Sequence, residues 1–247
     1  MSIIKLSKII IVLFLSLYFY SCQNKNNVVY DIEGNSYSTI RIGNQTWMAE
    51  NLRVTKYQNG DDIGWGSDNL IWVKEDDVWN NLEHGAWCDY NNDSVNGIKY
   101  GHMYNWYAVS DERNIAPIGW HVATDEDWKA LSMYLDNSEN NISYKVAKSL
   151  ASDSIWSSSN ELGSIGYDIG KNNSTGFCAL PGGYRQNSIF NSFGHLGYYA
   201  VWWCFSEYDL NNAYVRKLGD EGGSFINWRG FTSKKEGYYV RCVKNQE

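Results

Sequence analysis

Two Gly-Asn turns near the start of the chain separate three short runs of β-prone residues. The turns are Gly34-Asn35 and Gly43-Asn44, and the runs they separate are 28–33, 36–42 and 45–51. Gly-Asn pairs between such runs are strong signals for β-hairpins. The sequence therefore predicts that the folded part of the chain opens with an antiparallel meander.

Aromatic residues extend this prediction to the rest of the chain. The sequence has 12 Trp and 19 Tyr but only 2 Pro. Aromatic side chains favour strands over helices and bury large areas, so most of them should form core. We expect further strands in the C-terminal third, at 176–180, 198–205, 213–218, 224–228 and 238–243.

The clearest helical signal follows Thr124. This residue can cap a helix whose first turn holds Asp125, Glu126 and Asp127, and acidic side chains there complement the helix dipole. Apolar residues then recur at helical spacing, at Trp128, Leu131 and Leu135. A second helix is expected over 143–151, and long loops over 59–93 and 157–175. The fold class is therefore predicted as α+β, mostly antiparallel β with one or two helices and long loops.

The N-terminus has the pattern of an export signal. Lys5 and Lys8 precede the apolar run 9–20, which is shorter than the roughly 20 residues that span a bilayer. Ser21-Cys22 follows, and the run 19–22 resembles the lipobox of bacterial lipoproteins. That resemblance implies lipid on the Cys22 thiol and cleavage before it. An uncleaved anchor and cleavage elsewhere are the alternatives.

Three segments follow from that processing. They are a signal peptide (1–21), a lipidated tether (22–27) and one domain (28–247). Removal of the signal leaves 19 basic against 28 acidic residues, a net charge of −9. Such a chain repels a phosphate backbone, so nucleic-acid binding is not expected.

Four cysteines remain once Cys22 carries lipid. They are Cys88, Cys178, Cys204 and Cys242. An even number in an exported chain favours two disulfides with three possible connectivities, although free buried thiols also pack well. None of them has the C-x-x-C spacing of a redox or zinc site.

One segment has part of a calcium-loop pattern. Asp89, Asn91 and Asp93 have the spacing of the first three EF-hand ligands. Ser94 and Tyr100 replace the Gly and Glu that the pattern requires later. The segment is either a calcium site or a loop whose Asx side chains bond its own backbone. No other cofactor is expected.

Six segments in series resemble one family. They are NQTWMAENLR (44–53), YNWYAV (104–109), APIGWHV (116–122), DW (127–128), ALPGGYR (179–185) and VRCV (240–243). They are similar to the Fibrobacter succinogenes major paralogous domain family, over residues 28–244. This family is widespread on exported and lipidated bacterial proteins, and it implies no known activity. Its pattern also has Cys at two of the four positions, which implies the pairings Cys88–Cys242 and Cys178–Cys204.

A wider resemblance is to the C-type-lectin-like fold, which formylglycine-generating enzymes share. A Trp-bearing helix, Gly-rich loops and a final Arg-Cys-Val strand carry it. Sugar-binding lectins of this fold use Glu-Pro-Asn or Gln-Pro-Asp, together with Trp-Asn-Asp, to hold calcium. Pro117 and Pro181 lie in other contexts and Trp79-Asn80-Asn81 lacks the acid, so that calcium-bridged site is not expected.

Two charged residues beside aromatic strand sequence are candidate binding residues. Arg185 ends the segment GGYR and Glu207 follows Trp202 and Trp203. They form either a structural Arg–Glu pair or, together with these two tryptophans, a ligand-facing group. No G-x-S-x-G motif is present, and we assign no catalytic residue.

Three function classes remain open. The first is an envelope binding module that recognises glycan or protein through its loop face, because loops on a rigid scaffold usually carry function. The alternatives are a structural lipoprotein and, less favoured, an enzyme with the fold of formylglycine-generating enzymes. The residues after Cys22 lack an acidic run, which favours the outer membrane with the domain facing the periplasm.

Overall fold

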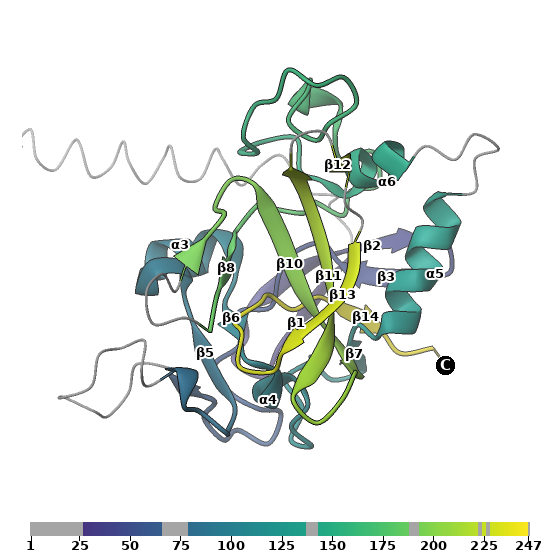
Figure 1. The fold of residues 1–247 in the computed structure, drawn as a ribbon. Helices are drawn as coiled ribbons and strands as arrows, with labels where there is room; N and C mark the ends of the chain where they lie inside the picture. The colour runs from purple at the N-terminus through teal and green to yellow at the C-terminus, as the bar shows by residue number, and fades with distance from the viewer. Residues whose placement is uncertain are drawn as a thin grey trace, which may run out of the picture.

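The computed structural model describes residues 27–65, 79–136, 143–187, 193–221, 224–225 and 228–246. Within these ranges the chain is mostly antiparallel β with four short α-helices, so the predicted α+β class is confirmed (Figure 1). The predicted signal peptide, Cys22 and the tether up to residue 26 lie outside the described residues.

The first sheet joins the two ends of the domain. Its order is β1 (Val28–Tyr30), β2 (Ser36–Ile42), β3 (Gln45–Met48), β14 (Cys242–Lys244) and β7 (Trp120–Val122). The predicted N-terminal meander is therefore confirmed. Val243 of β14 lies opposite Trp47 on one side and His121 on the other, so the last strand lies inside the sheet, between β3 and β7.

The second sheet has four strands, two of which are the longest of the described strands. They are β10 (Tyr199–Glu207), β11 (Asn212–Glu221), the short β12 (Ser224–Phe225) and β13 (Trp228–Ser233). β11 pairs with β10 on one side and with β13 on the other, both antiparallel. The predicted strand 224–228 is thus divided between β12 and the start of β13. Figure 1 shows the β10–β11 hairpin crossing the front of the molecule, with its turn at the bottom of the view.

The rest of the described chain holds short elements, a few of which fall inside the segments predicted as loop. β4 (Gly64–Trp65), β5 (Ala86–Cys88) and β6 (Met103–Tyr104) form a small sheet, and β8 (Tyr184–Arg185) pairs with β9 (Phe193–Gly194). The 3-10 turns are η2 (Tyr90–Asn92) and η3 (Ile169–Lys171). Helices α3 (Ser94–Tyr100) and α4 (Trp106–Val109) begin after Asp93 and Asn105, whose side chains accept from the first-turn N–H groups.

Both predicted helices form. α5 (Asp125–Leu135) has a capping box, in which Thr124 and Asp127 each accept the other's backbone N–H. α6 (Ser143–Leu150) ends one residue before its predicted limit. The predicted strand 176–180 is wrong, because this segment makes only one bridge, from Ala179 to Ala151.

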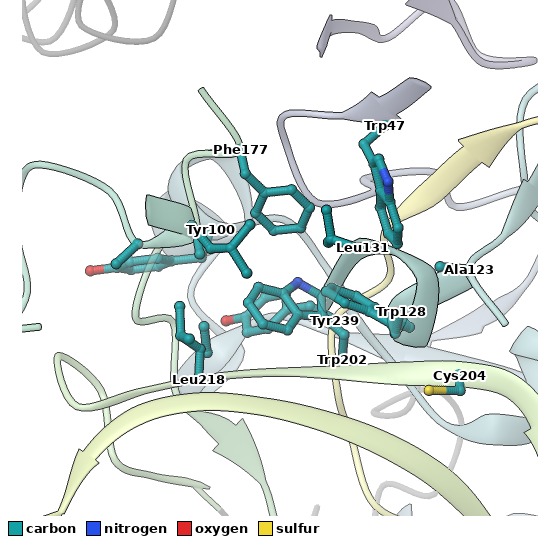
Figure 2. Close-up of a cluster of buried hydrophobic side chains, with 14 of the residues drawn as sticks. Trp47, Tyr100, Ala123, Trp128, Leu131, Phe177, Trp202, Cys204, Leu218 and Tyr239 are labelled. Carbon is teal, nitrogen blue, oxygen red and sulfur yellow. The ribbon is translucent and has the colours of Figure 1, made fainter. Parts of the chain in front are cut away.

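An aromatic core fills the space between α5 and β10. Trp128 lies 4.8 Å from Trp47 and 5.2 Å from Trp202, measured between ring centroids, and Phe177 packs edge-on against Trp202 (Figure 2). Trp203 points to the other face of β10, into a second cluster with Tyr104 and Tyr238. Because β10 is covered on both faces, its first six residues are all buried.

The two predicted disulfides are wrong. Cys88, Cys204 and Cys242 are free, buried thiols. Cys88 lies in the core cluster around Trp202, whereas Cys242 lies in the cluster around Trp203, so the even cysteine count does not reflect pairing between them. Burial raises the pKa of Cys88 and of Cys204 to about 12, and the positive charges of Arg185 and Arg216, respectively, oppose this rise.

Candidate ligand-binding surface

Three aromatic rings lie together at the turn end of the second sheet, two of them exposed and the third, Tyr214, partly buried against the core. Tyr208 and Phe231 stack with their centroids 3.8 Å apart and their planes 5° from parallel. Tyr214 meets Tyr208 edge-on at 5.3 Å. Tyr208 is 46% exposed and Phe231 49% exposed, so the stack faces solvent rather than the core. We call Tyr208, Tyr214 and Phe231 the aromatic platform.

Strand register places these residues on one face of the sheet. Tyr214 lies directly opposite Phe231, and two positions along Arg216 lies opposite Arg229. Directly paired residues share a face, as do residues two apart on one strand. Two aromatic and two arginine side chains therefore belong to the same face. The intervening position, Val215, points into the core.

The N-terminus of α5 supports this face through Asp125. Arg216 donates through Nη2 to Asp125 Oδ1 over 2.6 Å, and Arg229 donates through Nε to Oδ1 and Oδ2 over 2.9 and 2.8 Å. Like charges opposite each other on neighbouring strands repel, and Asp125 offsets this repulsion by bonding both. The guanidinium of Arg229 lies 4.0 Å above the Tyr214 ring, so this network fixes the edge of the platform.

The β10–β11 turn holds Tyr208 in place. The Tyr208 N–H donates to the carbonyl of Asn212 over 3.1 Å. Asp209 Oδ1 accepts from the backbone N–H groups of Asn211 and Asn212, each over 2.8 Å. Hydrogen bonds from Asn212 and Asn211 lower the pKa of Asp209. The turn is thus fixed by its own side chains, which makes the platform a preorganised surface.

Glu207 lies near the platform but on the other face. It is opposite Ala213, one residue before Tyr214, and therefore points away from the aromatic rings. Its carboxylate pairs with Lys234, whose Nζ also lies 4.7 Å above the Trp106 ring. The predicted structural pair with Arg185 does not form, because Lys234 is the partner of Glu207.

The other predicted binding residues lie in the core. Arg185 is buried, with its guanidinium 4.7 Å above the Trp79 ring and 4.9 Å above Phe193. Trp202 donates to Asn51 Oδ1 over 2.8 Å, and Trp203 donates to the carbonyl of Tyr104 over 2.7 Å. The structure therefore places these three side chains in packing roles rather than on a ligand-facing surface.

The predicted calcium ligands serve other purposes in the structure. Asp89 is buried and accepts a 2.6 Å hydrogen bond from His102 Nδ1. Asp93 caps α3 by accepting from Val95 N–H, and Asn91 has a left-handed backbone conformation with φ of 56°. Across the described ranges, no group of three or more His, Cys, Asp or Glu side chains is arranged to hold a metal. Calcium binding stays a prediction.

Sequence reasoning did not find Tyr208, Tyr214, Arg229 or Phe231. Aromatic residues that alternate along strands predict burial on one face, and nothing local distinguishes a covered face from an open one. The segment Tyr208-Asp209-Leu210-Asn211-Asn212 does carry a signal. It has the polar composition of a tight turn, so an aromatic residue at its start is expected near the surface.

Comparison with known proteins gives one family. The Fibrobacter succinogenes major domain matches residues 40–244. No curated protein and no solved structure matches the chain, so the C-type-lectin-like topology stays a prediction. In the part of the chain that the structure describes, no helix is long and apolar enough to cross a membrane.

Proposed function

The chain belongs to the Fibrobacter succinogenes major domain family, and we propose that it is a lipid-anchored module of the cell envelope that binds glycan chains through the aromatic platform. The observation that carries the proposal is the solvent-exposed stack of Tyr208 on Phe231. Packing normally covers such large aromatic side chains, and exposed groups of them mark interaction sites.

The chemistry of the platform suits a sugar chain. Tyrosine and phenylalanine supply rigid apolar contact area at a low entropic cost, and a tyrosine hydroxyl adds a polar group at the edge. The apolar faces of sugar rings can stack on such rings, while their hydroxyl groups find hydrogen-bond partners at the rim. Arg229 supplies such a partner beside Tyr214.

The proposed anchor keeps this surface close to a membrane. Val28 begins β1 six positions after Cys22. An extended chain of that length reaches about 20 Å, so a lipid on Cys22 would hold the domain against the bilayer. The absence of an acidic run after Cys22 supports the periplasmic side of an outer membrane. Polysaccharides of the envelope would then be within reach of the platform.

A glycan array probed with the full-length protein in detergent tests the proposal. We expect binding by the wild type and a loss of about tenfold or more in the Tyr208→Ala variant, since central aromatic contacts often contribute over 1 kcal/mol. Tyr198→Ala is the matched control, because Tyr198 is 51% exposed outside the platform. A protein that binds no glycan would favour the structural-lipoprotein alternative, and equal losses in both variants would place the site elsewhere.

A further inference from the structure

We propose that the glycan bound at the aromatic platform carries carboxylate groups, as uronic-acid polysaccharides do, and that Arg229 selects them. The inference rests on the proposed function and names the chemical class of its ligand. In this proposal Arg229 determines the specificity for carboxylate groups, and Asp125 positions Arg229.

The hydrogen bonds of Arg229 to Asp125 use only part of its guanidinium. Its contacts to Asp125 run through Nε, at 2.9 and 2.8 Å, and its guanidinium carbon lies 4.0 Å from the centroid of the Tyr214 ring. The side chain is 48% exposed. The hydrogen bonds to Asp125 therefore do not use its two Nη groups, which belong to a guanidinium beside the rings on which a sugar would stack. A guanidinium edge binds a carboxylate through two parallel hydrogen bonds.

The local charge balance favours an anion. Among the described residues, Asp125 is the one carboxylate that bonds Arg229, and it is shared with Arg216. Within this cluster of three side chains, two guanidinium groups and one carboxylate leave one positive charge. Glu207 does not cancel it, since Glu207 points to the opposite face and pairs with Lys234. Asp209 lies in the adjoining turn with its carboxylate turned to backbone N–H groups.

The positive charge beside the platform is opposite in sign to the net charge of the whole chain. The formal net charge is −7, which disfavours non-specific attraction of polyanions. Acidic glycans would therefore bind only where local positive charge offsets the repulsion by the rest of the chain, and Arg229 supplies such a charge. A carboxylate at a fixed spacing from a stacked sugar ring would contact Arg229 and the platform together.

Three acidic polysaccharides and their neutral counterparts provide the test. Alginate, polygalacturonate and hyaluronan are each compared with the carboxyl-reduced form of the same polymer, by biolayer interferometry on immobilised full-length protein at constant ionic strength. We expect at least one acidic polymer to bind about tenfold or more tightly than its reduced form. Arg229→Gln should remove this preference, and Tyr208→Ala should weaken both forms.

Two further variants make the result specific. Arg113→Gln is the matched control. Like Arg229, Arg113 lies 4.0 Å above a tyrosine ring, that of Tyr57, and it bonds an aspartate and is 41% exposed. It lies outside the platform. It should keep the preference. Arg229→Lys retains a charge for Asp125 and lacks the planar fork, so it should lose most of the preference while keeping the fold, as checked by circular dichroism.

The outcomes separate the two proposals. Equal binding of acidic and reduced polymers, or an unchanged preference in both Arg229 variants, overturns the inference and leaves the proposed function standing. The same holds if only neutral glycans of the array bind. If no glycan of either class binds, the proposed function and the inference both fail.

Discussion

Arg241 donates through Nε to Asn51 Oδ1 over 2.7 Å, across 190 positions of sequence. The same guanidinium donates to the carbonyl groups of Met48, Phe177 and Cys178. Asn51 also accepts from Trp202 and donates to the carbonyl of Tyr100. Two segments that carry the family resemblance, 44–53 and 240–243, therefore meet in one buried polar network. Their residue types are explained by the fold rather than by a ligand.

Replacement of Arg241 with Met should destabilise the domain by about 3 kcal/mol or more. Several buried acceptors lose their donor, and each unsatisfied buried polar group costs about 1–3 kcal/mol. Burial lowers the pKa of Arg241 to about 9, so it stays protonated at neutral pH. Urea unfolding measures the change. Arg41→Met, at an exposed position of β2, should stay within about 0.5 kcal/mol of the wild type. Similar stabilities of the two variants would refute the role of Arg241.

The free thiols should be unreactive in the folded protein. Cys88, Cys204 and Cys242 are buried, and burial raises the pKa of each. Because the thiolate is the reactive form, iodoacetamide should label none of these three under native conditions and all three in urea. Mass spectrometry of peptides identifies the labelled sites. Rapid native labelling, or a Cys88–Cys242 disulfide in a non-reducing digest, would contradict the structure.

His121 should make stability depend on pH. Its pKa is raised, first by the hydrogen bond between its Nε2 and Asp127, and further by the bond between its Nδ1 and Asn245. A raised pKa in the folded state contributes stability that is fully present below about pH 6.5 and is lost as the pH rises through the folded value. The urea midpoint of His121→Gln should therefore fall below wild type at about pH 5.5 and approach it at about pH 8.5. A deficit that grows with pH would reverse the assignment.

Local signals account for what could be predicted from the sequence. The β1–β3 meander depends on Gly-Asn turns, and α5 depends on the capping box of Thr124 and Asp127, all within a few residues. The placement of β14 between β3 and β7 depends on segments more than 100 positions away, and no local pattern encodes it. Cysteine parity failed for the same reason. The number of cysteines does not show which thiols the fold brings together, and Cys88 and Cys242 lie in different core clusters.

The candidate site also depends on contacts between segments far apart in the sequence, which no local pattern predicts. Glu207 is a candidate because it lies beside aromatic strand sequence, but its pairing with Lys234 depends on how the sheet folds. Tyr214 and Phe231 come together only through the β11–β13 register. Whether their face is open depends on how far α5 extends over the sheet. The exposed platform is therefore a property of the tertiary structure, and the sequence predicts only that its residues lie in strands.

The Cys22→Ser variant should move from the membrane pellet to the soluble fraction. Stable anchoring requires lipid chains, and serine lacks the thiol that would carry them. Gln23→Ser is the adjacent control and should remain with membranes. Protease treatment of intact cells then tests the side, with the domain expected to be protected. A Cys22→Ser protein that still pellets would exclude the lipid anchor, and digestion of the domain would place it on the cell surface.

Hydroxyl-radical footprinting tests the central claim most directly. The full-length protein is oxidised with and without the glycan that binds best on the array, and peptide mass spectrometry measures modification of each aromatic residue. We predict protection of Tyr208 and Phe231 in the complex and unchanged modification of Tyr198. Unchanged modification of Tyr208 and Phe231 in the presence of saturating glycan would contradict the assignment of the platform as the binding surface.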